Sequence, residues 1–445
     1  MTFSRKLGYG LGIYGPMLGW VAALQYLLYF YTEVVGLAPT QAGLIFMIGM
    51  VWDAVSDPLI GTLADRTRTR WGRYRPYLLF GALPYGISIA ILFTPPSGSP
   101  GTMFAIALAA HLVFRTGYTL VYMPYTAMIA RMTVDYDSRT DLTAFKTFFV
   151  FAGNLTVSFA FYALVMRFGS GEERAGFAPA AALIGVVAAL TAWLCFAFTD
   201  EKGLRGSDDR QASTIPLRSI TGDLIANRPF LLIFAGVALF GGVYGGELAM
   251  IAYMAKYWFN DTAVSRTLFT TQAVMSLASV PLWLYLGRRY GKKFVWITGT
   301  SLAALGLIAI FLLESKSVPL TAALYGINNV GATGFIMIFY AVTADSVDWG
   351  EWQTGRRQEG VIFGAISFAN KFAAGVATGA VGTALVWVGF VTDVEQTDET
   401  LLGMRVIGLL VPAVGFLVST ALMLAYPISK ARHEEIVAAT AARTG

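Results

Sequence analysis

The sequence predicts an all-α integral membrane protein with twelve transmembrane helices in two bundles of six. Of its 445 residues, 56% are hydrophobic and 13% are charged, whereas a soluble domain carries about 25% charged residues. Apolar runs of about 20 residues, the length that crosses the hydrocarbon core of a bilayer, recur along the whole chain. A single long polar connection, residues 199–227, falls near its middle.

Each apolar run is predicted to be one membrane-spanning helix. The spans are residues 7–32, 40–65, 76–95, 102–131, 143–166, 177–198, 228–258, 266–287, 293–313, 318–345, 360–389 and 402–428. The first run is too long for a signal-peptide core, so we expect it to be retained. The predicted domains are residues 1–198, the first six-helix bundle; 199–227, a cytoplasmic linker; 228–430, the second bundle; and 431–445, a cytoplasmic tail.

Basic residues gather in alternate loops of this predicted topology. Five arginines lie in residues 66–75 and four Lys or Arg residues in 288–293, whereas the last loop of the opposite side, residues 393–399, is acidic. The positive-inside rule therefore predicts that both termini are cytoplasmic. Because the basic residues of these loops account for the net charge of +5, we expect no nucleic-acid partner. The expected partner is the lipid bilayer.

Several function classes are disfavoured by what the chain lacks. Cys195 is the single cysteine, and His111 and His433 are the two histidines, which leaves no material for a disulfide framework or a cysteine–histidine metal cluster. There is no Gly-Lys-Ser/Thr phosphate-binding loop for ATP. We therefore expect neither an enzyme nor a bound cofactor. A ligand sensor would need a long soluble output domain, which the short tail after Lys430 does not provide.

Asp53 and Asp57 are the feature around which the rest is arranged. Both lie inside a predicted span, and residues four apart on a helix share one face. Each ionised carboxylate at the bilayer centre costs about 2.5–3.5 kcal/mol on insertion scales. A bound monovalent cation or a proton would relieve this cost and the repulsion between the two acids. The alternative is a purely structural ion pair with Lys371.

The two halves of the sequence repeat one another. Gly72 corresponds to Gly291 and Arg139 to Arg357, a spacing of about 218 residues. Two homologous bundles of six helices are typical of carriers that work by alternating access, with a site near the bilayer midplane where the bundles meet.

Longer motifs resemble a known family. Gly61-x-x-x-Asp65-Arg66 followed by Gly72-Arg73 resembles the major facilitator superfamily. WDAVSDPLIG, DRTRTRWGRYRP, ADSVDWGEW and the RRQEG…NK segment resemble its glycoside-pentoside-hexuronide:cation symporters, and this likeness extends over the whole chain. It implies the major facilitator fold and a monomeric symporter of the inner membrane, which takes up a small organic solute, a sugar or glycoside, with Na⁺, Li⁺ or H⁺.

The resemblance also implies a cation site and a coupling residue. The family's cation ligands match Asp53, Ser56, Asp57 and Thr119, with Na⁺ or H⁺ held at Asp53 and Asp57. Hard oxygen ligands of this kind suit Na⁺. The family's lysine on the eleventh helix matches Lys371, which we expect to pair with the two acids when the cation is absent.

The substrate site departs from the family. The positions of its galactoside-binding acids fall on Met17 and Tyr122, neither of which is a carboxylate. An amphipathic or lysolipid-like solute is therefore the alternative to a sugar. The residues expected to face the solute are polar or amphipathic side chains within the spans: Trp20, Tyr26, Arg115, Tyr118, Tyr122, Lys146 and Glu247.

Charged residues at the predicted cytoplasmic helix ends form the last group of candidates. We interpret them as a gate that ties the two bundles together when the carrier opens outward. Simple positive-inside topology is the alternative explanation. The predicted gate consists of Asp65, Arg66, Arg73, Arg139, Asp348, Glu351 and Arg357.

Overall fold

A computed structural model describes residues 2–133, 136–201, 217–356, 358–428 and 430–444 of the chain. In this part twelve helices are long and apolar enough to cross a membrane, each at one of the predicted spans. The described residues contain no strand beyond an isolated bridge between Thr69 and Gly72. The predicted all-α membrane fold is therefore confirmed.

Contacts between residues divide the chain into two compact units. The first unit contains residues Met1–Asp208, Ile251–Thr270 and Gly379–Gln396, and the second contains Asp209–Met250, Thr271–Thr378 and Thr397–Gly445. Two segments from the second half of the sequence thus pack with the first six helices. Most of the predicted linker lies outside the described residues, and the predicted domain boundaries stay a prediction.

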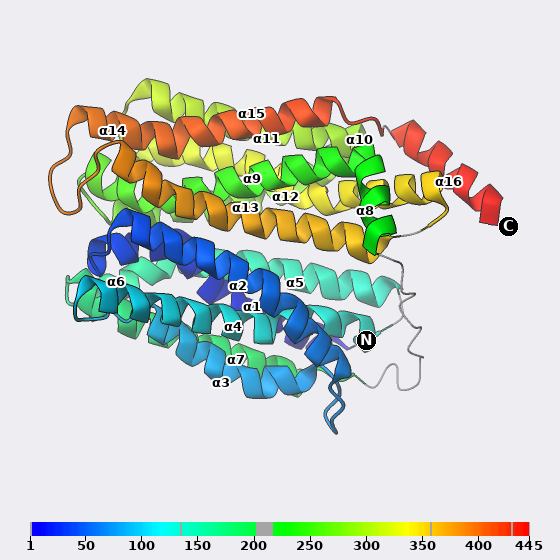
Figure 1. Cartoon of the computed structure of the whole chain (residues 1–445), viewed down its shortest axis with the longest axis horizontal. Helices are drawn as coiled ribbons and strands as arrows, with labels where there is room; N and C mark the ends of the chain where they lie inside the picture. Colours follow the sequence, from blue (N-terminus) through cyan, green and yellow to red (C-terminus); the bar gives the residue numbers. More distant parts are fainter. Residues whose placement is uncertain (1, 134–135, 202–216, 357, 429, 445) are drawn as a thin grey trace. The chain divides into compact units, whose positions relative to one another are not determined.

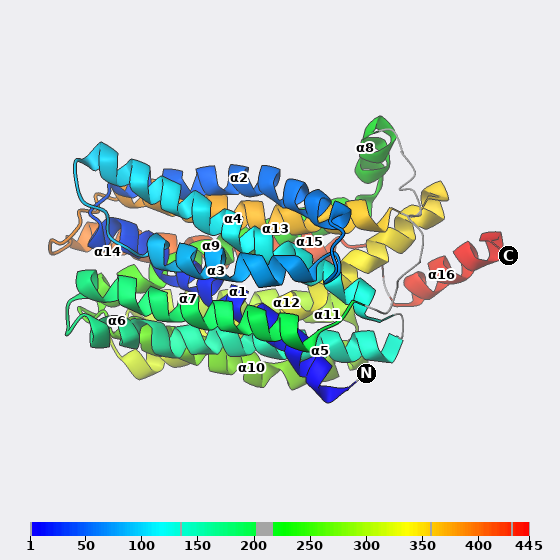
Figure 2. The same ribbon diagram turned by 90° about the horizontal axis from the view of Figure 1, so that it is seen from below.

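The first unit is a bundle of long helices that run side by side (Figures 1 and 2). Helix α1 packs against α5 and α7, α3 packs against α4 and α7, and α2 packs against α4. Its elements from the first half of the chain are α1 (Phe3–Tyr29), η1 (Phe30–Val34), α2 (Pro39–Arg66), α3 (Arg75–Leu92), α4 (Pro100–Met132), α5 (Tyr136–Thr156), η2 (Val157–Phe161), α6 (Tyr162–Phe168) and α7 (Glu173–Phe198).

Helix α2 has two distinct faces. Large apolar side chains at three- and four-residue spacing, including Val51, Val55 and Leu59, are exposed. This is the pattern of a helix with one face toward lipid. Asp53 and Ser56 lie on the other face and are each 7% exposed. The acids of α2 are therefore turned into the bundle, as a functional role for ionisable groups in a membrane span requires.

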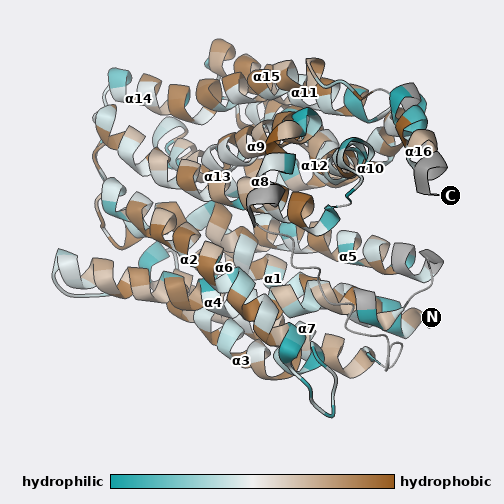
Figure 3. Ribbon diagram, turned by 45° about the vertical axis from the view of Figure 1, so that its right-hand side comes forward, coloured by the Kyte–Doolittle hydropathy of each residue, from teal (hydrophilic) through white to brown (hydrophobic). Residues whose placement is uncertain are grey.

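The second unit is built around α11 and α12, which pack on each other, with α15 against α11 and α16 against α12. Hydrophobic residues cover most of the helices, whereas hydrophilic ones are prominent in α16 (Figure 3). The remaining elements of the chain are α8 (Leu217–Ala226), α9 (Arg228–Tyr253), η4 (Met254–Trp258), α10 (Val264–Tyr290), α11 (Lys292–Leu313), α12 (Val318–Thr354), α13 (Glu359–Trp387), α14 (Asp398–Arg405), η5 (Val406–Leu410), α15 (Val411–Leu424) and α16 (Lys430–Thr444).

Helix α12 is longer than its apolar run. The span was predicted to end at residue 345, but the helix continues to Thr354 and stops where Gly355 has a φ of 68°. A glycine in this left-handed conformation is a common helix terminator. The polar residues Asp345 to Trp352 therefore extend the helix beyond its apolar part.

One buried carboxylate organises the loop between α2 and α3. Glu201 accepts hydrogen bonds from the backbone N–H groups of Arg73, Tyr74 and Arg75 at 2.7–2.8 Å. These N–H groups lie at the start of α3, where a helix has no acceptors of its own and favours negative charge. Gly72 has a φ of 111°, and a Cβ there would lie 2.6 Å from a Glu201 carboxylate oxygen. Glycine is thus required at this position.

We predict that Glu201→Ala destabilises the first unit. The substitution leaves three amide hydrogens without their charged acceptor, and hydrogen bonds to charged groups contribute about 1.5–3 kcal/mol each at most. Thermal unfolding of the purified protein in detergent should show a clearly lower Tm. Glu395→Ala, which removes an exposed carboxylate, is the control. Equal Tm values for the two variants would contradict the role given to Glu201.

Candidate functional site

The predicted cation ligands come together on two neighbouring helices of the first unit. Asp53 and Ser56 on α2 are buried, and Asp57 is half-buried. The Thr119 hydroxyl on α4 donates a hydrogen bond of 2.7 Å to Asp57 Oδ1. Ser56 Oγ is buried and has no hydrogen-bond partner among the described residues. A buried hydroxyl oxygen that accepts no hydrogen bond keeps its lone pairs available for another ligand.

Arg115 changes the charge of this site. Its guanidinium Nη1 lies 2.6 Å from Asp53 Oδ2, and the arginine side chain is 4% exposed. We expected Arg115 to face the solute, whereas the structure pairs it with one of the two acids. Asp53 thus has a positively charged partner within its own unit, Arg115.

The arginine is held in place by His111 and by the close approach of α2 to α4. Arg115 Nε donates to His111 Nε2 at 3.2 Å, and His111 Nδ1 lies 3.4 Å from the Tyr31 hydroxyl. Because Nε2 accepts a hydrogen bond, this imidazole is neutral with its proton on Nδ1. A Cβ at Gly49 would lie 2.6 Å from His111 Nε2. Only glycine leaves room for this ring between the helices.

The charges of the cluster add up to one net negative charge. Asp53 and Asp57 contribute two carboxylates, and Arg115, which is always protonated, contributes one positive charge. His111 adds none as the neutral imidazole. The cluster can therefore take up one monovalent cation, or one proton, and become neutral.

Three of the predicted substrate residues form an aromatic stack beside the arginine. Trp20 on α1 stacks on Tyr118 with ring centroids 4.9 Å apart, and Tyr118 stacks on Tyr122 at 5.0 Å. The Arg115 guanidinium lies 5.0 Å from the centre of the Trp20 ring, in the range of a cation–π interaction. Lys146 on α5 lies 6.0 Å from the Tyr125 ring.

Of the remaining predicted site residues, one lies in the first unit and two lie in the second. Tyr26 is buried among Phe161, Tyr162 and Phe269, and its described ring contacts do not reach the Trp20 stack. Glu247 on α9 and Lys371 on α13 belong to the second unit. An approach of Lys371 to the two acids therefore stays a prediction.

Three of the predicted gate residues, Asp65, Asp348 and Arg73, have described contacts inside their own units. The Tyr74 hydroxyl donates to Asp65 at 2.7 Å, and burial together with this carboxylate raises the pKa of Tyr74 to about 12. Asp348 lies 3.0 Å from His433 Nε2 on α16. The backbone of Arg73 binds Glu201, and Glu351 lies in α12. Arg66 is the last residue of α2. The side chain of Arg139, and Arg357 as a whole, lie outside the described residues.

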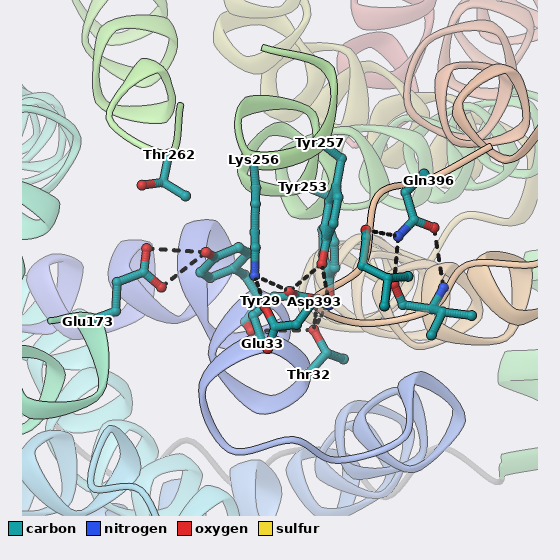
Figure 4. A network of polar contacts seen from close by, with 12 residues as sticks. Tyr29, Thr32, Glu33, Glu173, Tyr253, Lys256, Tyr257, Thr262, Asp393 and Gln396 are labelled. Atoms are coloured by element: carbon teal, nitrogen blue, oxygen red, sulfur yellow. Dashed lines mark hydrogen bonds and ion pairs between the residues drawn. The ribbon is translucent and has the colours of Figure 1, made fainter. Parts of the chain in front are cut away.

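A polar network that sequence analysis missed lies at the end of α1 opposite the N-terminus (Figure 4). Lys256 Nζ contacts both Glu33 Oε2 and Asp393 Oδ1 at 2.5 Å, and the Tyr257 hydroxyl donates to Glu33 Oε2 at 2.5 Å. The Tyr257 hydroxyl also accepts a hydrogen bond from the Asp393 backbone N–H at 3.0 Å. All of these residues belong to the first unit.

Two further contacts extend this network. Thr32 Oγ1 lies 2.7 Å from the Tyr253 hydroxyl, and the Tyr29 hydroxyl donates to Glu173 at 3.0 Å (Figure 4). We call Tyr29, Thr32, Glu33, Glu173, Tyr253, Lys256, Tyr257 and Asp393 the outer network. It links helices from the first half of the chain to the segments 251–270 and 379–396 from the second half.

Helix geometry explains how the outer network forms. Thr32 and Glu33 lie in η1, and Lys256 and Tyr257 lie in η4, both of which are π-helical turns. Such turns insert one extra residue, shift the faces of the helix and are frequent at functional sites. The sequence offered one weak signal, charged residues near the ends of two apolar runs.

Comparisons with known proteins find transporters that match nearly the whole chain. The profile of the MFS/sugar transport protein family matches residues 8–430. The chain is 30% identical to a candidate glycoside/cation symporter of Escherichia coli (strain K12), over 98% of this chain and 94% of that protein. It is 28% identical to the isoprimeverose transporter of Lactiplantibacillus pentosus, over 97% and 90% of the two chains. It is also 27% identical to the glucuronide carrier protein homolog of Escherichia coli (strain K12), over 98% and 95%.

Solved structures show the same fold at lower identity. A bacterial homolog of the human lysosomal transporter Spinster matches with a TM-score of 0.68 and 14% identity, over 95% of both chains. A bacterial homologue of the iron transporter ferroportin matches with a TM-score of 0.67 and 14% identity, over 96% of this chain and 99% of that one. The predicted major facilitator fold is thereby confirmed.

We predict that Arg115→Gln destabilises the protein more than the double variant Arg115→Gln/Asp53→Asn. Removing one partner of a buried ion pair leaves an uncompensated charge and costs about 3–5 kcal/mol, whereas removing both leaves no buried charge. Thermal unfolding of wild type, both single variants and the double variant gives the four stabilities of a double-mutant cycle. Additive changes in stability would show that the two side chains do not interact.

Proposed function

The chain belongs to the MFS/sugar transport protein family, and on this premise we propose that it couples uptake of a sugar or glycoside to one monovalent cation. The family and the relatives are membrane transporters, which confirms the prediction of a multi-pass transporter rather than an enzyme. The observation that carries the proposal is the single net negative charge left by Asp53, Asp57 and Arg115 in the first unit.

The cation we propose is Na⁺ or H⁺, bound at Asp57 with oxygen atoms of Ser56 and Thr119 and in the field of Asp53. The unsatisfied Ser56 hydroxyl and the Thr119 hydrogen bond to Asp57 support this assignment. Since Arg115 neutralises Asp53, one cation per cycle makes the cluster neutral. A conformational change that keeps the cluster in low-dielectric surroundings costs less free energy when the cluster is neutral. We therefore propose that the cation-loaded carrier is the form that changes from one open side to the other.

A sugar or glycoside is the favoured solute for two reasons. Two relatives are named as an isoprimeverose transporter and a glucuronide carrier homolog. In this chain, Trp20, Tyr118 and Tyr122 present stacked rings beside Arg115, and aromatic rings with polar tips suit a ligand with apolar faces and hydroxyl groups. An amphipathic or lysolipid-like solute is the second candidate, favoured by Met17 and Tyr122 at the positions of the family's acids.

Alternating access requires contacts that form and break. We propose that the outer network closes one side of the carrier, since it ties segments from both halves of the chain together, and that it opens in the opposite state. Lys371 would then approach the two acids when the cation leaves. The charge asymmetry of its loops places both termini in the cytoplasm in this proposal. We further propose that the protein works as a monomer in the plasma membrane.

The first test is uptake of labelled glycosides into proteoliposomes with imposed Na⁺ or pH gradients. We predict that Asp57→Asn no longer accumulates the glycoside against its concentration gradient, because the cation ligand is gone. The ratio of inside to outside glycoside should fall at least about tenfold if coupling supplies 1.4 kcal/mol or more. Movement of the glycoside down its own concentration gradient should persist. Asp398→Asn, on α14, is the control. Accumulation that is indifferent to both gradients and to Asp57→Asn would refute cation coupling.

The second test concerns the outer network. Lys256→Gln removes the positive partner of both Glu33 and Asp393, so we predict more time in the outward-open state. The native Cys195 is buried, which allows a cysteine introduced at Met17 to be labelled selectively with a membrane-impermeant maleimide. Labelling from outside should rise several-fold in Lys256→Gln but not in Lys316→Gln. Unchanged labelling would show that the network does not hold this side closed.

A further inference from the structure

Glu247 is a buried carboxylate whose described hydrogen-bond partners are neutral amides. It lies in the membrane-spanning helix α9, is 0% exposed and belongs to the second unit. Gln272 on α10 donates to its Oε1 at 3.2 Å, and Asn328 on α12 donates to its Oε2 at 3.4 Å. Among the described residues no lysine, arginine or histidine pairs with it.

The amide of Asn328 has its orientation fixed by a third group. Its Nδ2 also donates to the backbone carbonyl of Ala303 on α11 at 3.2 Å. The nitrogen therefore points toward both Ala303 and Glu247, and Oδ1 is left buried without a hydrogen-bond partner among the described residues. A Cβ at Gly306 would lie 2.9 Å from the Asn328 backbone nitrogen, so α11 and α12 are closely packed at this point.

The surroundings of Glu247 are polar but uncharged. The other titratable groups that interact with it are the phenols Tyr244 on α9 and Tyr325 on α12. The Tyr244 hydroxyl accepts a hydrogen bond from Asn329 at 3.4 Å. Helix α10 contributes Gln272, and α11 contributes the Ala303 carbonyl, neither of which carries a charge.

An ionised carboxylate in these surroundings is costly, because two long hydrogen bonds from neutral amides replace its hydration. Binding of a proton removes the charge. The side chain of Gln272 can then turn its amide oxygen toward the acid and accept the new O–H, so both states of Glu247 can be hydrogen-bonded. An alkali ion is disfavoured, because Asn328 presents N–H rather than oxygen to the carboxylate.

We propose that Glu247 is a second ion-binding site of the transporter and that its ligand is a proton. The proton comes from water on the side to which the carrier is open, converts the carboxylate to the acid, and is released to water on the other side. This site belongs to the second unit, whereas Asp53 and Asp57 belong to the first, and its existence does not depend on which cation binds at Asp57.

Infrared difference spectroscopy of the full-length protein in liposomes tests this proposal. Between about pH 5 and about pH 9, a range that covers free and buried glutamic acids, the carbonyl band of a protonated carboxylic acid should appear and disappear. We expect Glu247→Gln to remove this band and Asp57→Asn to keep it. The proposal is overturned if no band that depends on Glu247 titrates, or if Na⁺ at constant pH displaces it.

A second variant keeps the proposal testable if Glu247→Gln misfolds. Gln272→Leu keeps the acid and removes one of its hydrogen-bond partners, so the same band should remain but change its frequency. Ser279→Ala on α10, whose hydroxyl donates to a backbone carbonyl of its own helix, is the matched control and should leave the band unchanged. A band that is equally unaffected by Gln272→Leu would not belong to Glu247, and the assignment would be wrong.

Discussion

The constraint on which this structure depends is the cost of charge inside a membrane-spanning bundle. Asp53 is tolerated because the Arg115 guanidinium lies 2.6 Å away. Asp57 is half-buried and receives the Thr119 hydroxyl. Two acids in a fully apolar environment would be protonated or would unfold the helix pair. The arginine leaves one negative charge of this arrangement uncompensated, and on that charge we base the proposal of cation coupling.

Close helix contacts make this compensation possible. His111 reaches Arg115 because residue 49 on α2 is a glycine, and its ring fills the space that a side chain would take. Elsewhere in the first unit, a Cβ at Gly43 would lie 2.2 Å from the backbone carbonyl oxygen of Gly379. Glycines in membrane helices allow backbones to approach closely. Here they place polar groups where neighbouring side chains can satisfy them.

The sequence predicted the helices and the faces of the helices well, because both are local properties. Apolar runs located all twelve spans, and the four-residue spacing placed Asp53 and Asp57 on the inner face of α2. The family resemblance added Thr119, which does contact Asp57. The end of α12 was missed because the stop is set by Gly355 and its positive φ rather than by hydropathy.

Partners between helices could not be predicted. Periodicity shows that Arg115 and Thr119 share a face of α4, but not that the arginine meets Asp53, 62 residues away. Lys256 and Glu33 are 223 residues apart in the chain and meet through two π-helical turns. Neither turn has a sequence pattern that would reveal the shifted face. Glu201 looked like an ordinary linker residue until its three backbone donors were seen.

The two units surround a buried carboxylate with different chemical groups, and these groups affect which ion can bind. In the first unit the Arg115 guanidinium compensates the charge of Asp53, and the Thr119 hydroxyl contacts Asp57. Oxygen atoms can coordinate either a proton or an alkali ion. In the second unit amide N–H groups point at Glu247 from two helices. These long amide hydrogen bonds replace only part of the hydration of an ionised carboxylate, and their N–H groups offer no oxygen ligand to a metal cation. Under our two proposals, a proton can therefore bind in both units, whereas Na⁺ binds only in the first.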